Sequence, residues 1–365
     1  MPDDPRLAEA KALPWDQVGG RLGIDGLKRA GRELVGPCPM CGGTDRFSVD
    51  PKRGVYNCRH CGGGDWVRLV EQHERLDFRG ALLWLVGDAP PDPAEAERRR
   101  AAAARAARDR DARSDRERRK AIRLALDVWR QCLPAEGTPV RAYLARRGLD
   151  RELLPDLPDD IRFHPDLPYA VNRSGTWHRI HAGPAMVAAV RKPSGEIGAV
   201  HRTWIDAATP SGKPQIVDPE TGEAQKAKKT LGSVKGGAIR LIAGQRPILV
   251  MGEGIETTLS ARAATGGHAA LWAGVSLSNM SGRRVTGKGM KYAGEPDLED
   301  RDAFVPPPWV RRLIFIQDGD SEPRLTRAQL RAGLARAKSA LPHLRVQIVA
   351  ADEGRDLNDM LRGAA

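Results

Sequence analysis

Residues 247–264 read Pro-Ile-Leu-Val-Met-Gly-Glu-Gly-Ile-Glu-Thr-Thr-Leu-Ser-Ala-Arg-Ala-Ala and decide how the end of the chain folds. Their first part is an apolar run of the length of a buried strand, and their last part carries apolar residues at helical spacing. Glu253 lies between the two parts, flanked by Gly252 and Gly254. In an open parallel sheet, ligands bind in the crevice beyond the carboxyl ends of the strands. We therefore expect the Glu253 carboxylate to point into a site rather than into a core.

A second apolar run, at residues 313–316, ends in the same way and is followed by Gln317-Asp318-Gly319-Asp320. Taken alone, Asp-Gly-Asp is more typical of a turn than of a metal site. The preceding strand and the matching Glu253 favour a site. Strand ends that gather Glu253, Asp318 and Asp320 would bring together carboxylates that repel one another unless a divalent cation lies among them. The sequence therefore predicts Mg²⁺ or Mn²⁺ and phosphate chemistry.

This arrangement resembles the TOPRIM domain that bacterial-type primases and topoisomerases share, over about residues 246–363. The resemblance implies catalytic roles for Glu253, Asp318 and Asp320. Asp356 matches the further acid of the Gly-Lys-Asp region in primase TOPRIM domains, so the resemblance implies that Asp318, Asp320 and Asp356 bind magnesium.

Four strands are expected in this last domain, at residues 248–251, 269–273, 313–316 and 346–350, with helices between the first two and the last two. Such alternation predicts a parallel sheet with helices on both faces. The chain departs from the family in two places. Asp320 is followed by Ser-Glu-Pro rather than by the usual small residue and glycine. The family also often has a second acid four residues after its Glu. This chain has Thr257 there, and Glu256 lies one place earlier.

The strongest local signal is a pair of Cys-x2-Cys knuckles separated by sixteen residues: Cys38 and Cys41, then Cys58 and Cys61. Two such knuckles complete a closed tetrahedral zinc site. A redox dithiol is the weaker alternative, because no β-α-β pattern surrounds either pair. Four thiolates leave no ligand position for His60, and Cys132 is expected to be a small buried thiol.

The segments around the knuckles resemble the zinc ribbon of phage and plasmid primases: Cys38-Pro-Met-Cys41-Gly-Gly-Thr-Asp-Arg-Phe and Tyr56-Asn-Cys58-Arg-His-Cys61-Gly-Gly-Gly-Asp-Trp. The bacterial replicative relatives have a His in the first knuckle where this chain has Cys41, so the all-cysteine phage type fits better. In that family the ribbon helps to recognise the single-stranded template. Arg46, Phe47, Arg59 and Trp66 are candidates for contacting bases, although Phe47 and Trp66 are also expected to form the core of so small a ribbon.

The length of 365 residues allows two or three domains. We expect a multidomain α+β and α/β fold with four parts: a zinc-ribbon DNA-binding domain over 1–90, an Ala/Arg-rich helical linker over 91–131, a basic α/β primase N-terminal subdomain over 132–245, and the TOPRIM sheet over 246–365.

The formal net charge of +12 favours polyanionic partners such as nucleic acid. Residues 98–120 contain eleven Lys or Arg and four Asp or Glu, however, so a solvated helix or tether accounts for +7 of this charge. No apolar run approaches the roughly 20 residues of a membrane helix, and the start lacks a signal pattern. We expect a cytoplasmic protein without a membrane partner.

The middle of the chain has apolar stretches at 184–190 and 197–200 that flank a turn at 192–195, which predicts a hairpin. Cations on glycine-spaced backbone follow at 226–237 and suit either phosphate contacts or a soluble surface. The arrangement resembles the basic subdomain that precedes TOPRIM in bacterial-type primases. That likeness implies Arg202 and Lys229 as template, nucleotide or phosphate contacts, with Lys228 as the alternative match. His181 and His201 have no paired nucleophile, so structural roles are favoured for both.

The ribbon, the basic subdomain and the acidic crevice lead to one main hypothesis, a DNA primase of phage, prophage or plasmid type. Such a nucleotidyltransferase is a DNA-directed RNA polymerase that makes short RNA primers from NTPs on single-stranded DNA in replication. Glu253 would orient the primer 3′-hydroxyl or assist its deprotonation. The alternatives are a TOPRIM-type metal-dependent DNA nuclease and a non-enzymatic zinc-ribbon factor that binds single-stranded DNA.

Two further functions are disfavoured. A topoisomerase needs a tyrosine nucleophile in a downstream domain, and the four tyrosines have no such setting. A helicase needs a P-loop, and no Gly-x4-Gly-Lys-Ser/Thr pattern occurs. The replicative helicase is therefore expected to be a separate partner.

Overall fold

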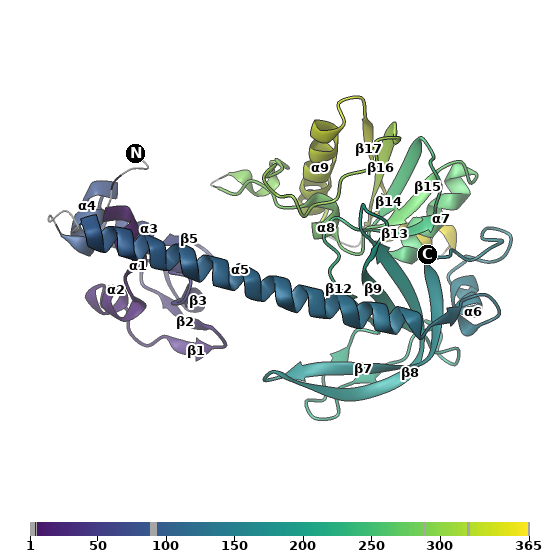
Figure 1. Ribbon diagram of the computed structural model, residues 1–365, viewed down its shortest axis with the longest axis horizontal. Coiled ribbons are helices and arrows are strands. Elements are labelled where there is room, and N and C mark those ends of the chain that lie inside the picture. The colour runs from purple at the N-terminus through teal and green to yellow at the C-terminus, as the bar shows by residue number, and fades with distance from the viewer. Residues whose placement is uncertain (1–3, 5, 88–92, 288, 320–321, 364–365) are drawn as a thin grey trace. The chain divides into compact units, whose positions relative to one another are not determined.

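The computed structural model describes residue 4 and residues 6–87, 93–287, 289–319 and 322–363. The candidate ligand Asp320 lies outside the described residues. The chain divides into two compact units, Met1–Ser114 and Asp115–Ala365. The division falls within helix α5 (Pro93–Arg130), which covers most of the expected linker (Figure 1). Among the helices described, none is both long and apolar enough to cross a lipid bilayer.

The first unit is a five-stranded antiparallel sheet with its strands in chain order and helices at both ends of the ribbon. The strands are β1 (Lys28–Ala30), β2 (Glu33–Cys38), β3 (Gly42–Asp50), β4 (Val55–Cys58) and β5 (Gly62–Asp65). The helices are α1 (Arg6–Ala12), α2 (Trp15–Arg21), α3 (Trp66–His73) and α4 (Phe78–Val86). Residues 46–49 and 55–57 are strand-like and flank a turn at 51–54, which predicts a hairpin, and the β3–β4 pair forms it.

Asp65 and Asp77 each precede a helical pattern, which predicts helix starts there, and α3 and α4 begin directly after them. The Asp65 carboxylate accepts a hydrogen bond from the Arg68 amide at 3.1 Å, and the Asp77 carboxylate accepts one from the Gly80 amide at 2.8 Å. The apolar residues of α4 predict Leu82, Leu83 and Leu85 as inward positions, and Leu83 needs a correction. Leu82 and Leu85 are buried, whereas Leu83 is 44% exposed, because it lies on another side of the helix.

The second unit contains an antiparallel sheet in the order β12-β9-β8-β7-β6. Its strands are β6 (Leu133–Pro134), β7 (Ile161–Arg173), β8 (Thr176–Arg191), β9 (Ile197–Trp204) and β12 (Lys228–Gly232). Helix α6 (Pro139–Arg146) packs on one face of this sheet. Strands β10 (Ile216–Val217) and β11 (Ala224–Gln225) pair as a separate two-stranded hairpin. The expected hairpin around residues 192–195 is the β8–β9 pair.

A second sheet of this unit has the order β13-β15-β14-β16-β17. Its strands are β13 (Ile239–Ile242), β14 (Ile248–Gly252), β15 (Ala270–Ala273), β16 (Arg312–Gln317) and β17 (Arg345–Ala350). The helices that follow or join them are α7 (Ile255–Thr265), α8 (Leu277–Ser281), α9 (Pro323–Ala340) and α10 (Leu357–Leu361), with a 3-10 turn η1 (Met290–Tyr292). Helices α7 and α9 lie on opposite sides of the sheet (Figure 1).

The four expected strands of this sheet are present and mutually parallel. The fifth strand, β13, lies within the range predicted for the middle domain, but it pairs antiparallel with β15 at the sheet edge. Ile239 and Leu241 alternate inward along it, which explains why this short apolar stretch is buried against the last sheet. The expected boundary at residue 245 therefore cuts through one sheet.

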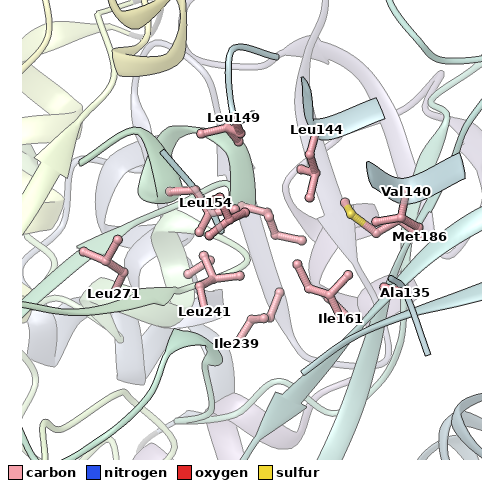
Figure 2. Close-up of a cluster of buried hydrophobic side chains, with 14 of the residues drawn as sticks. Ala135, Val140, Leu144, Leu149, Leu154, Ile161, Met186, Ile239, Leu241 and Leu271 are labelled. Carbon is pink, nitrogen blue, oxygen red and sulfur yellow. The ribbon is translucent and has the colours of Figure 1, made fainter. Parts of the chain in front are cut away.

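One hydrophobic cluster joins the two sheets of the second unit, and Figure 2 shows part of it. Val140 and Leu144 come from α6, and Met186 comes from β8. Ile239 and Leu271 come from the other sheet, and all five side chains are at most 1% exposed. The antiparallel sheet and the α7 side of the mixed sheet thus bury their apolar surface against each other and form a single compact unit.

Replacing Met186 by Ala tests this shared core. Met186 is 0% exposed, so the change should lower the free energy of unfolding by about 2–5 kcal/mol. The substitution would leave a cavity in the hydrophobic cluster that both sheets line. Amide hydrogen exchange should therefore accelerate in both β9 and β14. Met360 is 36% exposed, and Met360→Ala is the matched control with little expected effect. Faster exchange in β9 alone would show that the sheets are separate domains.

Candidate functional site

Glu253 and Asp318 follow two neighbouring parallel strands, β14 and β16. Met251 pairs with Phe315, so the carboxyl ends of the two strands meet at the same edge of the sheet. The β14 end is fixed further by its other neighbour, since the Val275 amide donates to the Glu253 carbonyl at 3.0 Å. The two acids therefore lie where the strand pattern places them, beyond the carboxyl edge.

The loop after β17 is held tightly against the β16 end. The Gly319 amide donates to the Arg355 carbonyl at 2.9 Å, and the Gly354 amide donates to the Gly319 carbonyl at 3.0 Å. A Cβ atom at Gly319 would lie 2.0 Å from the Asp352 carbonyl oxygen, so only glycine fits this approach. Asp356, at the end of the same loop, caps α10. Its carboxylate accepts a hydrogen bond from the Asp359 amide at 2.7 Å.

A pocket of about 450 Å³ brings these acids together with cations. Glu253, Asp318 and Asp356 line one part of it, and they come from the mixed sheet and the loop after it. The cations come from the antiparallel sheet, its loops and the residue after α6: Arg147, Lys213, Lys226 and Lys228. We call these two groups the acid wall and the cation wall.

The acid wall offers carboxylate oxygens, the donors that Mg²⁺ and Mn²⁺ prefer. Within the described part of the chain, its carboxylates do not form a group whose ligand atoms all lie within 4.8 Å of one another. Mg²⁺ is usually bound through one or two carboxylates together with waters and substrate phosphates, rather than by an all-protein cage. The donor set therefore fits a magnesium ion that arrives with a phosphorylated substrate.

The register of β9 and β12 decides which predicted cations reach the pocket. Lys228 pairs with Thr203, whereas Lys229 pairs with Arg202, and successive side chains point to opposite faces. Lys228 lines the pocket. Lys229 lies over the Tyr169 ring at 4.3 Å and donates to a backbone carbonyl, on the face away from the pocket.

The predicted phosphate contacts at Arg202 and Lys229 thus need a correction of position. The Arg202 guanidinium lies 5.3 Å from the Trp204 ring, on the same face as Lys229. The alternative, Lys228, occupies the pocket because it is one residue away on the strand. A shift of one residue moves a strand side chain to the other face, so the side chains of two adjacent strand lysines point to opposite faces of the sheet.

His201 also lines the pocket, and its Nδ1 lies 3.0 Å from the Thr230 hydroxyl. Burial and the charge of Lys228 lower the pKa of His201 to about 4, so the imidazole is neutral near pH 7. It therefore adds no charge to the cation wall.

Glu256 and Lys213 are pocket residues that the sequence reading did not select. Glu256 is 8% exposed, accepts a hydrogen bond from the Tyr143 hydroxyl and has its Oε1 3.9 Å from the Lys213 Nζ. Burial alone would raise the pKa of Glu256, but Lys213 and Lys228, with the Tyr143 hydroxyl, hold it at about 2. The spacing Glu253-x-x-Glu256 was a signal for Glu256. Lys213 belongs to a loop, and no local pattern marks it.

The four ribbon cysteines form a second site. The Cys38 and Cys61 sulfurs are 4.0 Å apart, those of Cys41 and Cys58 are 3.6 Å apart, and all four lie within 4.8 Å of one another. A tetrahedral zinc with Zn–S bonds of 2.3 Å requires sulfurs about 3.8 Å apart. The arrangement therefore fits a structural zinc ion.

The base contacts expected in the ribbon need a correction at Trp66. This side chain is 0% exposed, and its indole N–H donates to the Leu13 carbonyl at 2.9 Å. Phe47 is also 0% exposed, so neither ring has a face open for stacking on a base. Both rings serve the core of the small unit. Arg46 is half-buried beside Gly43, and Arg59 pairs with Asp45 at 2.8 Å.

Two families match parts of the chain. Residues 34–67 match the zinc-binding domain of primase-helicase, and residues 119–241 match a domain of unknown function, DUF7146. The zinc ribbon is therefore of the primase type. The second match covers the end of α5 and the antiparallel sheet, and its description names no activity.

Individual relatives are also primases. The DNA primase of Halalkalibacterium halodurans is 41% identical over 58 residues, which are 15% of this chain and 10% of that protein, so the match spans a tenth of the relative's length. The zinc-binding and RNA polymerase domains of the Aquifex aeolicus primase match 100% of this chain and 83% of their own, with 14% identity and a TM-score of 0.35. A DNA primase domain from Pseudomonas aeruginosa matches 67% of this chain and 75% of its own, with 16% identity and a TM-score of 0.36. TM-scores this low do not establish a shared fold.

The zinc site gives a direct test. Wild-type protein should contain one zinc ion per chain by metal analysis, and Cys41→Ser should lose it, because three thiolates no longer close the tetrahedron. Cys132 is the matched control, since it is buried and its thiol donates to the Val128 carbonyl at 3.1 Å, outside the cluster. Cys132→Ser should keep its zinc. Equal zinc in the Cys41→Ser variant would contradict the four-cysteine assignment.

Proposed function

We propose that this protein is a DNA primase that joins NTPs into short RNA primers on single-stranded DNA. The observation that carries the proposal is the pocket in which the acid wall, with Glu253 and Asp318, faces the cation wall, with Lys213 and Lys228. A nucleoside triphosphate with its magnesium ion needs both kinds of group, because carboxylates hold the metal and cations neutralise the remaining phosphate charge. The primase-type zinc ribbon supports the same function.

In this proposal Asp318, Asp320 and Asp356 are the magnesium ligands. A bound magnesium ion would neutralise charge on the phosphates of the incoming nucleotide and stabilise the transferred phosphoryl group. Asp356 also caps α10 through one carboxylate oxygen, so the short helix holds this side chain in a fixed orientation.

The remaining pocket residues bind and orient the substrates. Lys213 and Lys228 contact the triphosphate, and Arg147 adds a charge at the same wall. Glu253, at the end of β14, accepts a hydrogen bond from the primer 3′-hydroxyl and orients it for attack on the α-phosphate. The 3′-oxygen forms the new bond to phosphorus, and pyrophosphate leaves.

The template and the helicase come from outside the pocket. The zinc ribbon, with Arg46 as a candidate contact, selects the start site on single-stranded DNA. A separate replicative helicase supplies that strand. Magnesium-dependent cleavage of single-stranded DNA without NTPs would instead support the nuclease alternative, which uses the same acid wall with water as the nucleophile.

The test is primer synthesis by the purified protein on a library of single-stranded templates with NTPs and Mg²⁺. Wild type should make short oligoribonucleotides, and Asp318→Asn should lower the yield by about a hundredfold or more, because it removes a ligand charge. Glu353 lies in the same loop as Asp356, is exposed and does not line the pocket, so Glu353→Gln is the control with unchanged synthesis.

Two outcomes would contradict the proposal. One is the absence of primers on every template together with DNA cleavage, which would identify a nuclease. The other is unchanged DNA binding and no catalysis in both wild type and Asp318→Asn, which would identify a single-stranded DNA-binding replication factor.

A further inference from the structure

A buried charge network lies directly behind the cation wall. Glu256 is in the first turn of α7, three residues after Glu253, and only 8% of it is exposed. The Tyr143 hydroxyl from α6 donates to its carboxylate, and the Lys213 Nζ lies 3.9 Å away. Removing one partner of a buried ion pair is destabilising, because the other charge is left uncompensated. Glu256 and Lys213 are therefore energetically dependent on each other.

Lys213 reaches the pocket from a loop, and its side chain is 23% exposed. The loop packs against α6, where the Lys213 Nζ lies 5.8 Å from the centre of the Tyr143 ring. Gly212, at φ +71°, approaches the same ring so closely that a Cβ atom would lie 2.9 Å from it. The Thr209 hydroxyl donates to the Lys213 carbonyl at 2.9 Å. The backbone is thus held by the loop, and the end of the side chain is held by Glu256.

We propose that Glu256 is a positioning residue that keeps Lys213 charged and in place at the cation wall, where its ammonium group contacts the triphosphate of the incoming nucleotide. The ligand class, a nucleoside triphosphate, rests on the proposed primase function. Although Glu256 also lines the pocket, the role that we assign to it is exerted through Lys213. Its position three residues after Glu253 places the primer-binding acid and the support of the triphosphate-binding lysine on one strand-to-helix turn.

Several charged and titratable groups surround Lys213. Tyr143 lies against its side chain, and the pocket that it lines also contains Arg147, His201, Lys226, Lys228, Glu253, Glu256, Asp318 and Asp356. Burial, Lys228 and Arg147 lower the pKa of Lys213, while Glu256 and Asp356 raise it. Replacing Glu256 by Gln removes the strongest raising influence, so the pKa of Lys213 falls further. The Lys213 ammonium should then lose its proton as the pH rises, and phosphate binding should weaken with it.

The experiment measures equilibrium binding of Mg-ATP and of sodium tripolyphosphate by calorimetry between about pH 7 and pH 9, below the ordinary pKa of a lysine side chain. Glu256→Gln should bind ATP about tenfold more weakly than wild type, with a dissociation constant that increases with pH. Lys213→Met should weaken binding by a similar factor without the added pH dependence. The double variant should bind no more weakly than Lys213→Met, because both changes act through one charge.

A rescue variant separates positioning from a merely structural role. A guanidinium keeps its proton at all these pH values, so Glu256→Gln combined with Lys213→Arg should bind ATP without pH dependence. Asp160 forms another buried carboxylate pair, with the Arg191 Nε at 2.7 Å, outside this pocket. Asp160→Asn is the matched control and should bind ATP as wild type does.

Each result decides between the alternatives. Additive effects of the Glu256 and Lys213 changes, or pH-independent binding by Glu256→Gln, would overturn the proposal. If Glu256→Gln does not fold, Glu256→Asp replaces it, and this charge-retaining variant should weaken binding without pH dependence. Absence of ATP and tripolyphosphate binding by wild type at millimolar concentration would also overturn it. Tight ATP binding without primer synthesis would contradict the primase function alone.

Discussion

The burial of the antiparallel sheet against the α7 side of the mixed sheet is the interaction on which the pocket depends. Met186 and Ile239 belong to one hydrophobic cluster, so the strands that carry Lys228 and those that carry Glu253 and Asp318 cannot separate without exposing it. Burial of nonpolar surface is not directional, whereas a hydrogen bond is. One such directional contact lies at the pocket end of the two layers. The Tyr143 hydroxyl, from the antiparallel side, donates to a buried carboxylate on α7. The shared core holds the two layers together, and this hydrogen bond adds a directional contact between them.

The features that could be predicted from sequence are those set by neighbours along the chain. The β14 strand ends at a glycine before Glu253, and the β16 strand ends before Asp318, so both acids follow from a local change of pattern. Paired Cys-x2-Cys knuckles predict zinc because their spacing alone brings the thiolates together. Asp65 and Asp77 mark the starts of two helices in the same way, through hydrogen bonds that span three residues.

The features that could not be predicted depend on which surfaces meet after folding. Strand β13 carries too few residues to indicate its sheet, and only its edge pairing with β15 shows where it belongs. Lys213 enters the pocket from a loop whose position is set by the Tyr143 ring, a contact between distant parts of the chain. Lys228 and Lys229 are equally basic neighbours, and the pairing with β9 decides which of them faces the acids. The Trp66 ring is of a kind that stacks on bases, but it is buried in the core and has no open face for a base.

The shared core also has a consequence for synthesis on the ribosome. The antiparallel sheet is complete once β12 has emerged, yet the strands that cover its apolar face, up to β16, are translated later. At about 5–20 residues per second, the part of this face that α6 does not cover stays exposed for several seconds in every nascent chain. Contacts between such distant segments also form slowly. We therefore expect the nascent second unit to bind chaperones that recognise exposed apolar strands. The ribbon has its own core, so it can finish folding before β12 is translated.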